Sequence, residues 1–173
     1  MKDRITLTGK IGFEPEDKTK KHLLQSSWKK VAMVFIEGDI CEYYAWFLKK
    51  RYDISLNKPI RGAHVSFIND SMRDLTQNNA KSEEEALKLW EDVKTKWDGK
   101  EIDIVFDLNP KTNDRTWWLN IPNEERQGLQ AIRNELGLGK PFFGLHMSIG
   151  YVNEKNIEQS VYIHGLIKHG CIK

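Results

Sequence analysis

Cysteine is scarce in this chain, which has only Cys41 and Cys171 among its 173 residues. The two lie far apart in the sequence and form none of the closely spaced pairs typical of structural zinc sites. We therefore expect reduced thiols, as in the cytosol, rather than a disulfide framework. The His, Asp and Glu residues form no cluster at ligand spacing such as His-Glu-x-x-His, so no metal and no other cofactor is expected.

Long apolar runs and a strong charge of one sign are also missing. No segment approaches the roughly 20 apolar residues that span a membrane, and the N-terminus is unlike a secretion signal. We expect no membrane partner and a cytoplasmic location. The formal net charge of +2 argues against a protein that coats long nucleic acid. With 39% hydrophobic and 30% charged residues, the chain predicts one globular domain, 1–173.

Two short segments of the chain share one pattern. Residues 62–69 read Gly-Ala-His-Val-Ser-Phe-Ile-Asn, and residues 144–151 read Gly-Leu-His-Met-Ser-Ile-Gly-Tyr. Each is a short apolar run bounded by Gly or Asn, which predicts a buried strand. Because side chains alternate along a strand, His and Ser two residues apart point to the same face. Each strand therefore presents an imidazole beside a hydroxyl, in the pairs His64 with Ser66 and His146 with Ser148.

This set of side chains suits a reaction at a phosphorus atom. One imidazole removes a proton from the attacking oxygen, the other protonates the leaving oxygen, and the hydroxyls bind the non-bridging oxygens. The ordinary pKa of histidine, about 6.5, allows one neutral and one protonated ring near neutral pH. The sequence does not tell which histidine is the base and which is the acid.

The paired His-x-Ser motifs resemble those of the 2H phosphoesterase superfamily, whose members carry one such motif in each half of a pseudo-symmetric fold. The resemblance covers residues 31–168 and implies a fold of the α+β class. That fold is two-lobed and LigT-like, with a central cleft between two antiparallel sheets. Residues 1–30 form an N-terminal arm outside it. The resemblance further implies a metal-independent phosphodiesterase whose catalytic residues are His64, Ser66, His146 and Ser148.

Within that superfamily, the compact chain looks most like the phage nucleases that cleave 3′–5′ linkages of cyclic di- and trinucleotides. Those enzymes block the CBASS anti-phage signalling of the host, so a cyclic oligonucleotide is the expected partner. Two alternatives stay open. One is a 2′,3′-cyclic phosphodiesterase that processes RNA ends, as LigT proteins do. The other is a nucleotide-binding sponge without turnover, against which the intact His and Ser residues of both motifs argue.

Five further residues are candidates for substrate binding. Trp117 and Trp118 are two of six tryptophans, and aromatic rings stack on bases. As neighbours on a predicted strand they face opposite ways, so one belongs in the core and the other is exposed or at the cleft, unless both are packed. Arg61 and Lys140 precede the two histidine strands, where each reaches a phosphate or is simply a solvated cation. Tyr151 closes the second motif.

The remaining elements follow from apolar periodicity and from turn residues. Ser82 and Glu85 have the spacing of a capping box at the start of a helix. Alternating apolar residues within the first 13 residues predict a short hairpin or an extended segment of the arm. The other expected elements are a strand at 31–36, helices at 40–51, 82–97, 122–136 and 154–168, and a hairpin of strands 102–108 and 116–121.

Overall fold

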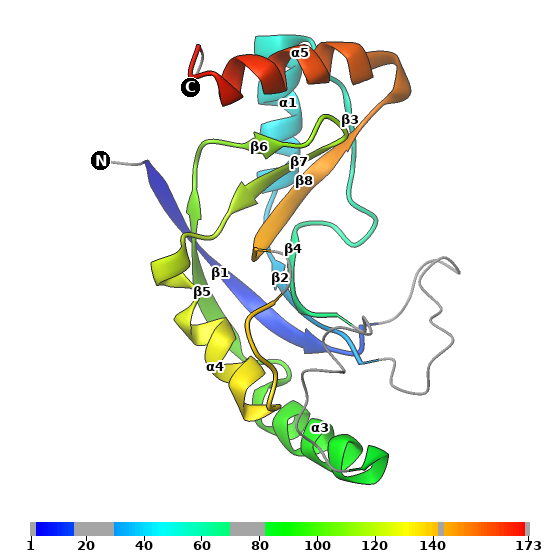
Figure 1. Cartoon of the computed structure of the whole chain (residues 1–173), viewed down its shortest axis with the longest axis vertical. Helices are drawn as coiled ribbons and strands as arrows, with labels where there is room; N and C mark the ends of the chain where they lie inside the picture. The colour runs from blue at the N-terminus through cyan, green and yellow to red at the C-terminus, as the bar shows by residue number, and fades with distance from the viewer. Residues whose placement is uncertain (1–2, 16–29, 70–81, 142–143, 172–173) are drawn as a thin grey trace.

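The computed structural model describes residues 3–15, 30–69, 82–141 and 144–171, which form an α+β fold as predicted (Figure 1). The strands are β1 (Arg4–Phe13), β2 (Ala32–Ile36), β3 (Leu56–Asn57), β4 (His64–Ile68), β5 (Glu101–Asp107), β6 (Lys111–Thr112), β7 (Thr116–Asn120) and β8 (His146–Val152). The helices are α1 (Ile40–Tyr52), α3 (Glu83–Trp97), α4 (Gln127–Glu135) and α5 (Ile157–Lys168). Single 3-10 turns, η2 (Asn123–Glu125) and η3 (Glu154–Asn156), precede α4 and α5.

The strands form one curled sheet of eight strands, in the order β5-β1-β2-β4-β8-β7-β6, with β3 also paired to β8. Every strand pair in the described ranges is antiparallel. The prediction of two separate sheets is therefore wrong. The strands that carry the two histidine motifs, β4 and β8, pair with each other and join the halves into one sheet. They do so through a single registered pair, Val65 opposite Met147.

The sheet and its helices divide into two groups that meet at the β4–β8 pair. We call β5, β1, β2 and β4 with α3 and α4 the first lobe, and β3, β8, β7 and β6 with α1 and α5 the second lobe. The helices of the first lobe lie at one end of the molecule, and those of the second lobe lie at the other end (Figure 1). Helix α1 follows β2 in the chain yet packs on β8, and α4 precedes β8 yet packs on β4. Each histidine strand is thus covered by a helix from the other half of the sequence.

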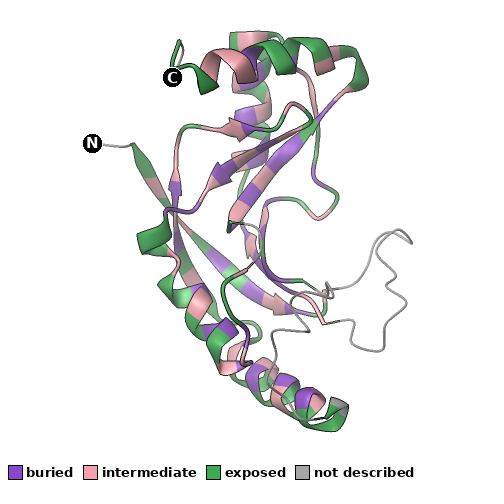
Figure 2. Cartoon of the chain, in the orientation of Figure 1, coloured by how far each residue is buried: buried purple, intermediate pink, exposed green. Residues whose placement is uncertain are grey.

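One face of the sheet is covered by these helices. Leu48 from α1 and Leu129 from α4 belong to the same core cluster as Val65 and Met147 of the sheet. Along the strands, buried residues alternate with more exposed ones, as Figure 2 shows by colour. The thiol of Cys41, on α1, donates to the Ser148 carbonyl at 3.6 Å, which ties that helix to β8. Burial raises the pKa of this thiol to about 11.

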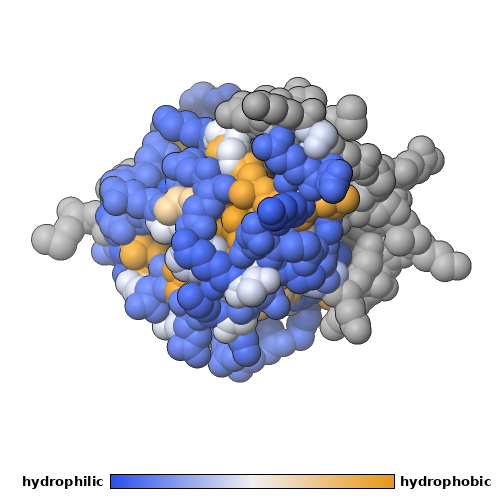
Figure 3. Space-filling model, turned by 90° about the horizontal axis from the view of Figure 1, so that it is seen from below, coloured by the Kyte–Doolittle hydropathy of each residue, from blue (hydrophilic) through white to orange (hydrophobic). Residues whose placement is uncertain are grey.

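The outer surface of the helices is polar. Seen from the end where α3 and α4 lie, most of the surface is hydrophilic, with apolar atoms gathered near its centre (Figure 3). Helix α3 begins as its capping box predicts, because the Ser82 hydroxyl accepts from the Glu85 backbone N–H at 3.2 Å. None of the helices described has the length and apolar character needed to cross a bilayer.

The interpretation of residues 1–30 as an arm outside the fold is wrong for its first part. Residues Arg4–Phe13 form β1, which pairs with β2 on one side and β5 on the other. Ile11 and Phe13 belong to the core. The alternation of apolar residues did indicate a strand, but this strand pairs with the next strand, β2, and with the distant β5 rather than within residues 1–13. Residues 16–29 of the predicted arm lie outside the described part of the chain.

The predicted hairpin of 102–108 with 116–121 is also wrong. β5 pairs with β1 at the edge of the first lobe, whereas β7 pairs with β6 and β8 in the second lobe. The turn after β5 therefore connects the lobes instead of closing a hairpin. An alternating strand shows which residues face the core, but it does not specify which strand lies beside it.

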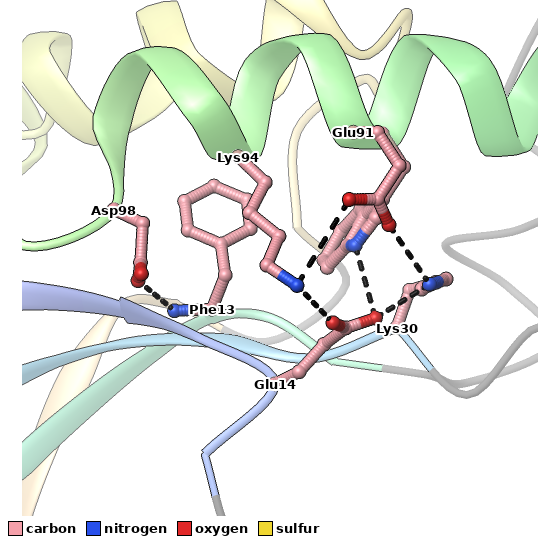
Figure 4. Close-up of polar contacts among 7 residues, drawn as sticks. Phe13, Glu14, Lys30, Glu91, Lys94 and Asp98 are labelled. Carbon is pink, nitrogen blue, oxygen red and sulfur yellow. Dashed lines mark hydrogen bonds and ion pairs between the residues drawn. The ribbon is translucent and has the colours of Figure 1, made fainter.

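The end of β1 is fixed to α3 by a partly exposed charge cluster (Figure 4). The Glu14 carboxylate accepts from the ammonium groups of Lys30 and Lys94, and from the Trp90 indole N–H at 3.2 Å. Burial acts to raise the pKa of Glu14, but the two ammonium groups outweigh it and hold the pKa below its ordinary value. One residue earlier, the Phe13 backbone N–H donates to Asp98 at 2.8 Å. These contacts hold β1 inside the first lobe.

A buried cation, Arg133, ties β4 to the segment that leads into β8. Arg133 of α4 is completely buried, and burial of a guanidinium requires that its N–H groups find acceptors. Its Nη1 donates to the Phe67 carbonyl at 2.6 Å and its Nε to the Gly139 carbonyl at 2.9 Å. Arg133 thereby connects the strand of the first histidine motif to the turn that precedes the second.

Gly9 provides a test of how closely β1 is packed. A Cβ atom added there would lie 2.5 Å from Val34 Cγ1 and 2.7 Å from Ile36 Cδ1, so Gly9→Ala forces β1 and β2 apart. We expect the free energy of unfolding to fall by about 1–3 kcal/mol. The matched control is Gly165→Ala in α5, where a Cβ meets nothing within 4 Å and alanine favours the helix by up to about 1 kcal/mol. Urea unfolding compares the two, and equal effects would contradict this account of β1.

Candidate active site

The two histidine motifs meet at the junction of the lobes. Val65 and Met147 face each other across β4 and β8, and both are completely buried under the helices. Side chains alternate along each strand, so the residues on either side of this pair point to the opposite face. We call this the histidine face. His64 and Ser66 from β4 lie on it beside His146 and Ser148 from β8, and all four are partly or fully exposed.

The antiparallel direction arranges the four side chains as the corners of a rectangle. His64 takes the position across from Ser148, and Ser66 the position across from His146. The two histidines therefore lie on one diagonal and the two serines on the other. A group bound at the centre of the rectangle has an imidazole on two opposite sides and a hydroxyl on the other two.

Both imidazole rings are held in the same way. His64 Nδ1 lies 2.9 Å from the Gly62 carbonyl, and His146 Nδ1 lies 2.7 Å from the Gly144 carbonyl. A carbonyl only accepts hydrogen bonds, so each Nδ1 carries a proton and donates it. In the neutral ring, Nε2 is then the nitrogen with the lone pair. Each histidine is thus set to exchange a proton through Nε2.

The two glycines that accept these bonds differ in backbone conformation and in surroundings. Gly62 has a φ of +71°, a backbone conformation that other residues adopt only with strain. Gly144 does not have a positive φ, but a Cβ atom added there would lie 3.3 Å from Nη2 of Arg126. The repeat of Gly two residues before His therefore reflects one hydrogen bond and two separate steric constraints.

Each histidine also has an aromatic neighbour on the strand outside it. The Phe35 ring, on β2, is registered with His64 and lies 6.5 Å from its ring centroid. The Trp118 ring, on β7, lies 5.9 Å from that of His146. Asn120 is registered with His146 and accepts from the Trp118 indole N–H at 2.9 Å. The histidine face thus has the order aromatic, histidine, histidine, aromatic across four strands.

Sequence reasoning missed two of these residues. Phe35 stands in the continuous apolar run of 31–36, whose composition does not show which members face the core. Asn120 follows Leu119 at the end of a predicted strand, and its position beside His146 depends on the pairing of β7 with β8. Strand alternation was the only sequence signal for either residue. It places Phe35 and Asn120 on the histidine face only when the pairing of β2 with β4 and of β7 with β8 is known.

The electrostatic surroundings of His64 disfavour its charged form. Burial lowers the pKa of His64 from its ordinary value of 6.5, and the positive charges of Arg61 and His146 lower it further. The hydrogen bond to the Gly62 carbonyl acts in the opposite sense but is outweighed. The neutral form of His64 is therefore favoured near neutral pH, and the coupling to His146 reflects the closeness of the two rings.

Of the two neighbouring tryptophans, Trp117 lies in the core and Trp118 lies on the histidine face. Trp117 is completely buried, donates its indole N–H to Ser160 at 3.2 Å and stacks with Tyr52. The prediction that it binds substrate is wrong, because no surface of the ring is accessible. Its neighbour Trp118 faces the other way and is the tryptophan beside His146.

Of the other predicted contacts, Tyr151 lies on the histidine face and Arg61 acts on His64. The register of β7 with β8 shifts at Trp117 and Trp118, which inserts one extra residue in β8. Tyr151 consequently pairs with Thr116 on the histidine face and is 46% exposed. Arg61 is half-buried and acts on His64 by its charge. Lys140 is exposed in the turn after α4, and in the described part of the chain no contact joins it to either histidine.

Comparisons of this chain with protein-family models, with curated proteins and with solved structures found no match. In the ranges that the structure describes, no group of three or more His, Cys, Asp or Glu side chains is placed to hold a metal ion. The site is therefore characterised by its own geometry: two imidazoles, two hydroxyls and two flanking rings on one face of the sheet.

Titration of His64 tests the electrostatic account. We expect its pKa below 6.5, because burial and two positive neighbours disfavour the charged ring. Arg61→Gln removes one of those charges and is expected to raise this pKa, whereas Lys140→Gln removes a remote charge and leaves it unchanged. The measurement is an NMR titration of the histidine ring carbons in the three proteins. A His64 pKa at or above 6.5, or equal values in both variants, would contradict the assignment.

Proposed function

We propose that this protein is a metal-independent phosphodiesterase of the 2H phosphoesterase type, acting on 3′–5′ linkages of cyclic di- or trinucleotides. The observation that carries the proposal is the pair of identically held imidazoles on adjacent strands, each with a serine on the same face. The exchange of helices between the two halves of the sequence and the junction through β4 and β8 fit the pseudo-symmetric fold of that superfamily. The biological role we propose is to block CBASS signalling.

In the proposed reaction, the lowered pKa of His64 assigns it as the general base. Its Nε2 takes the proton of a ribose 2′-hydroxyl, whose oxygen forms a bond to phosphorus. The bond from phosphorus to the 5′ oxygen breaks, and His146, protonated at both nitrogens, gives its Nε2 proton to that oxygen. The product is a 2′,3′-cyclic phosphate, which opens when water attacks in a second step of the same kind.

The two serines bind the phosphoryl group in this mechanism. They occupy the other diagonal of the rectangle, so their hydroxyls approach the phosphorus from the two sides that the imidazoles leave open. Hydroxyl donors aimed at the non-bridging oxygens stabilise the charge that develops there in the transition state. Ser66 and Ser148 have this role.

The flanking rings favour a substrate with a base on each side of the scissile phosphate. Phe35 lies beside His64 and Trp118 beside His146, so an aromatic surface is present on both sides of the rectangle. Stacking of a base on an aromatic ring contributes about 1–3 kcal/mol and tolerates any base. A cyclic dinucleotide has two bases that can stack on the two rings, whereas a 2′,3′-cyclic mononucleotide has one.

Replacement of the histidines tests the assigned roles. His64→Ala and His146→Ala are each expected to reduce single-turnover cleavage by about 10²–10⁴-fold, because each removes one proton transfer. The double variant is scarcely slower than the worse single variant, since both rings act in one step. Binding of the nucleotide, measured by calorimetry, persists in all three. Near wild-type turnover in either single variant would make that histidine structural.

The serines are tested in the same assay. Ser66→Ala and Ser148→Ala each remove one donor to the phosphoryl oxygens, and we expect rates lower by about 10²–10³-fold. Ser160→Ala is the matched control, because Ser160 lies in the core beside Trp117 and not on the histidine face. A loss of rate in the control equal to that in the other two would argue that serine removal acts through stability.

The substrate class is tested with a panel of cyclic dinucleotides and 2′,3′-cyclic mononucleotides, incubated with the protein in excess EDTA and resolved by chromatography. We expect cleavage of cyclic dinucleotides. Cleavage of the mononucleotides alone would favour the RNA-end processing activity of LigT proteins, and binding without cleavage would favour a sponge. Turnover that is lost in EDTA and restored by a divalent cation would overturn the metal-independent mechanism.

A further inference from the structure

Arg126 is an arginine at the edge of the histidine face that the motifs did not indicate. It lies between η2 and α4 and is half-buried. Its Nε donates to the Ile121 carbonyl at 2.8 Å, which fixes the plane of the guanidinium. Within the described residues, neither Nη atom has an acceptor or an acidic partner. The Nη1 and Nη2 atoms of Arg126 are thus held in place, and their N–H groups can donate to a ligand.

The guanidinium occupies the space that a side chain at Gly144 would fill. A Cβ atom built on Gly144 would lie 3.3 Å from Nη2 and 3.6 Å from Nη1 of Arg126. The ladder of β7 and β8 continues to this point, since the Ile121 N–H donates to the Leu145 carbonyl at 3.2 Å. Leu145 is buried in the core, so the Gly144 side-chain direction is that of His146. Arg126 therefore lies on the histidine face, in a row with His146 and Ser148.

Arg126 stands outside the rectangle of catalytic side chains. Gly144 precedes His146 by two residues, and two residues of a strand span about 6.5 Å. A phosphate centred between the two imidazoles is on the far side of His146 from the Gly144 position. The donors of Arg126 face a different part of the substrate from the part that reacts.

We infer that Arg126 binds a second phosphate of the substrate while the scissile phosphate lies between His64 and His146. An arginine fork suits this role because its parallel N–H groups match two phosphate oxygens. The absence of a side chain at Gly144 leaves room for the guanidinium. The inference rests on the proposed function and narrows it to substrates with two phosphates, such as cyclic dinucleotides, in preference to cyclic mononucleotides.

The test compares a ligand with two phosphates and a ligand with one. His64→Ala serves as the background, so that neither ligand is cleaved, and calorimetry measures binding of cyclic di-AMP and of 3′,5′-cyclic AMP. Adding Arg126→Met is expected to weaken cyclic di-AMP binding by about tenfold to a hundredfold, the range for hydrogen bonds to a charged group. Binding of the one-phosphate ligand changes by less than about twofold, well under a single such bond.

Two further variants separate a direct contact from other effects. Arg126→Lys keeps the charge but loses the fork, so its affinity for cyclic di-AMP lies between those of the parent and Arg126→Met. The two-phosphate effect also shrinks as NaCl is raised, because salt screens charge on phosphate. Lys155→Met removes one exposed cation elsewhere and leaves both affinities unchanged. If Arg126→Met does not fold by circular dichroism, Arg126→Lys carries the comparison.

The outcomes distinguish this inference from the proposed function. A selective, salt-dependent loss of cyclic di-AMP binding supports the role of Arg126. Equal losses for both ligands, or no loss for either, would overturn that role while cleavage by the wild-type protein still upholds the phosphodiesterase. Failure of the His64→Ala background to bind either nucleotide, together with no cleavage by the wild type, would overturn the proposed function and the inference with it.

Discussion

The pairing of β4 with β8 is the contact on which the site depends. It is the only registered link between the two lobes among the strands described, and it consists of Val65 opposite Met147. Both side chains are completely buried, which fixes the orientation of the strands they belong to. A slip of one residue in either strand would turn its histidine and serine toward the helices. Burial of two apolar side chains thus determines where four polar ones are exposed.

The exchange of helices between the halves of the sequence and one buried cation stabilise this junction. Helix α1 covers β8 and α4 covers β4, so each half of the sequence contributes the helix that supports the histidine strand of the other half. Arg133 adds hydrogen bonds from α4 to the Phe67 carbonyl and to the turn that leads into β8. Because these contacts join segments from both halves of the chain, the position of one histidine relative to the other is set by the whole fold.

The two histidines are alike in geometry but differ in environment. Both Nδ1 atoms donate to the carbonyl of a glycine two residues earlier, a local contact that each motif makes for itself. The lowered pKa of His64 has a tertiary cause, since burial and the charge of His146 come from other parts of the fold. The fold thereby disfavours the charged form of His64, as the role of a general base requires.

Short apolar runs and strand alternation account for how well the sequence predicted the strands. The strands at 31–36, 102–108 and 116–121 and both histidine strands occur where their patterns indicated. The alternation also showed that Trp117 and Trp118 face opposite ways, although it left open which of them is buried. The pairing of strands was less predictable. For example, nothing in the residues of β1 or of β5 specifies that these two strands lie side by side.

The sequence by itself determined the two His-x-Ser pairs, since two residues two apart on a strand share a face whatever surrounds them. It also determined the α+β class, because the helical and strand periods are local. The tertiary structure alone decided that β1 lies within the sheet and that His64 faces Ser148. It alone also placed Arg126 in the space beside Gly144. These relations depend on which distant segments pair, and that choice is made by the burial of the whole apolar core rather than by any one segment.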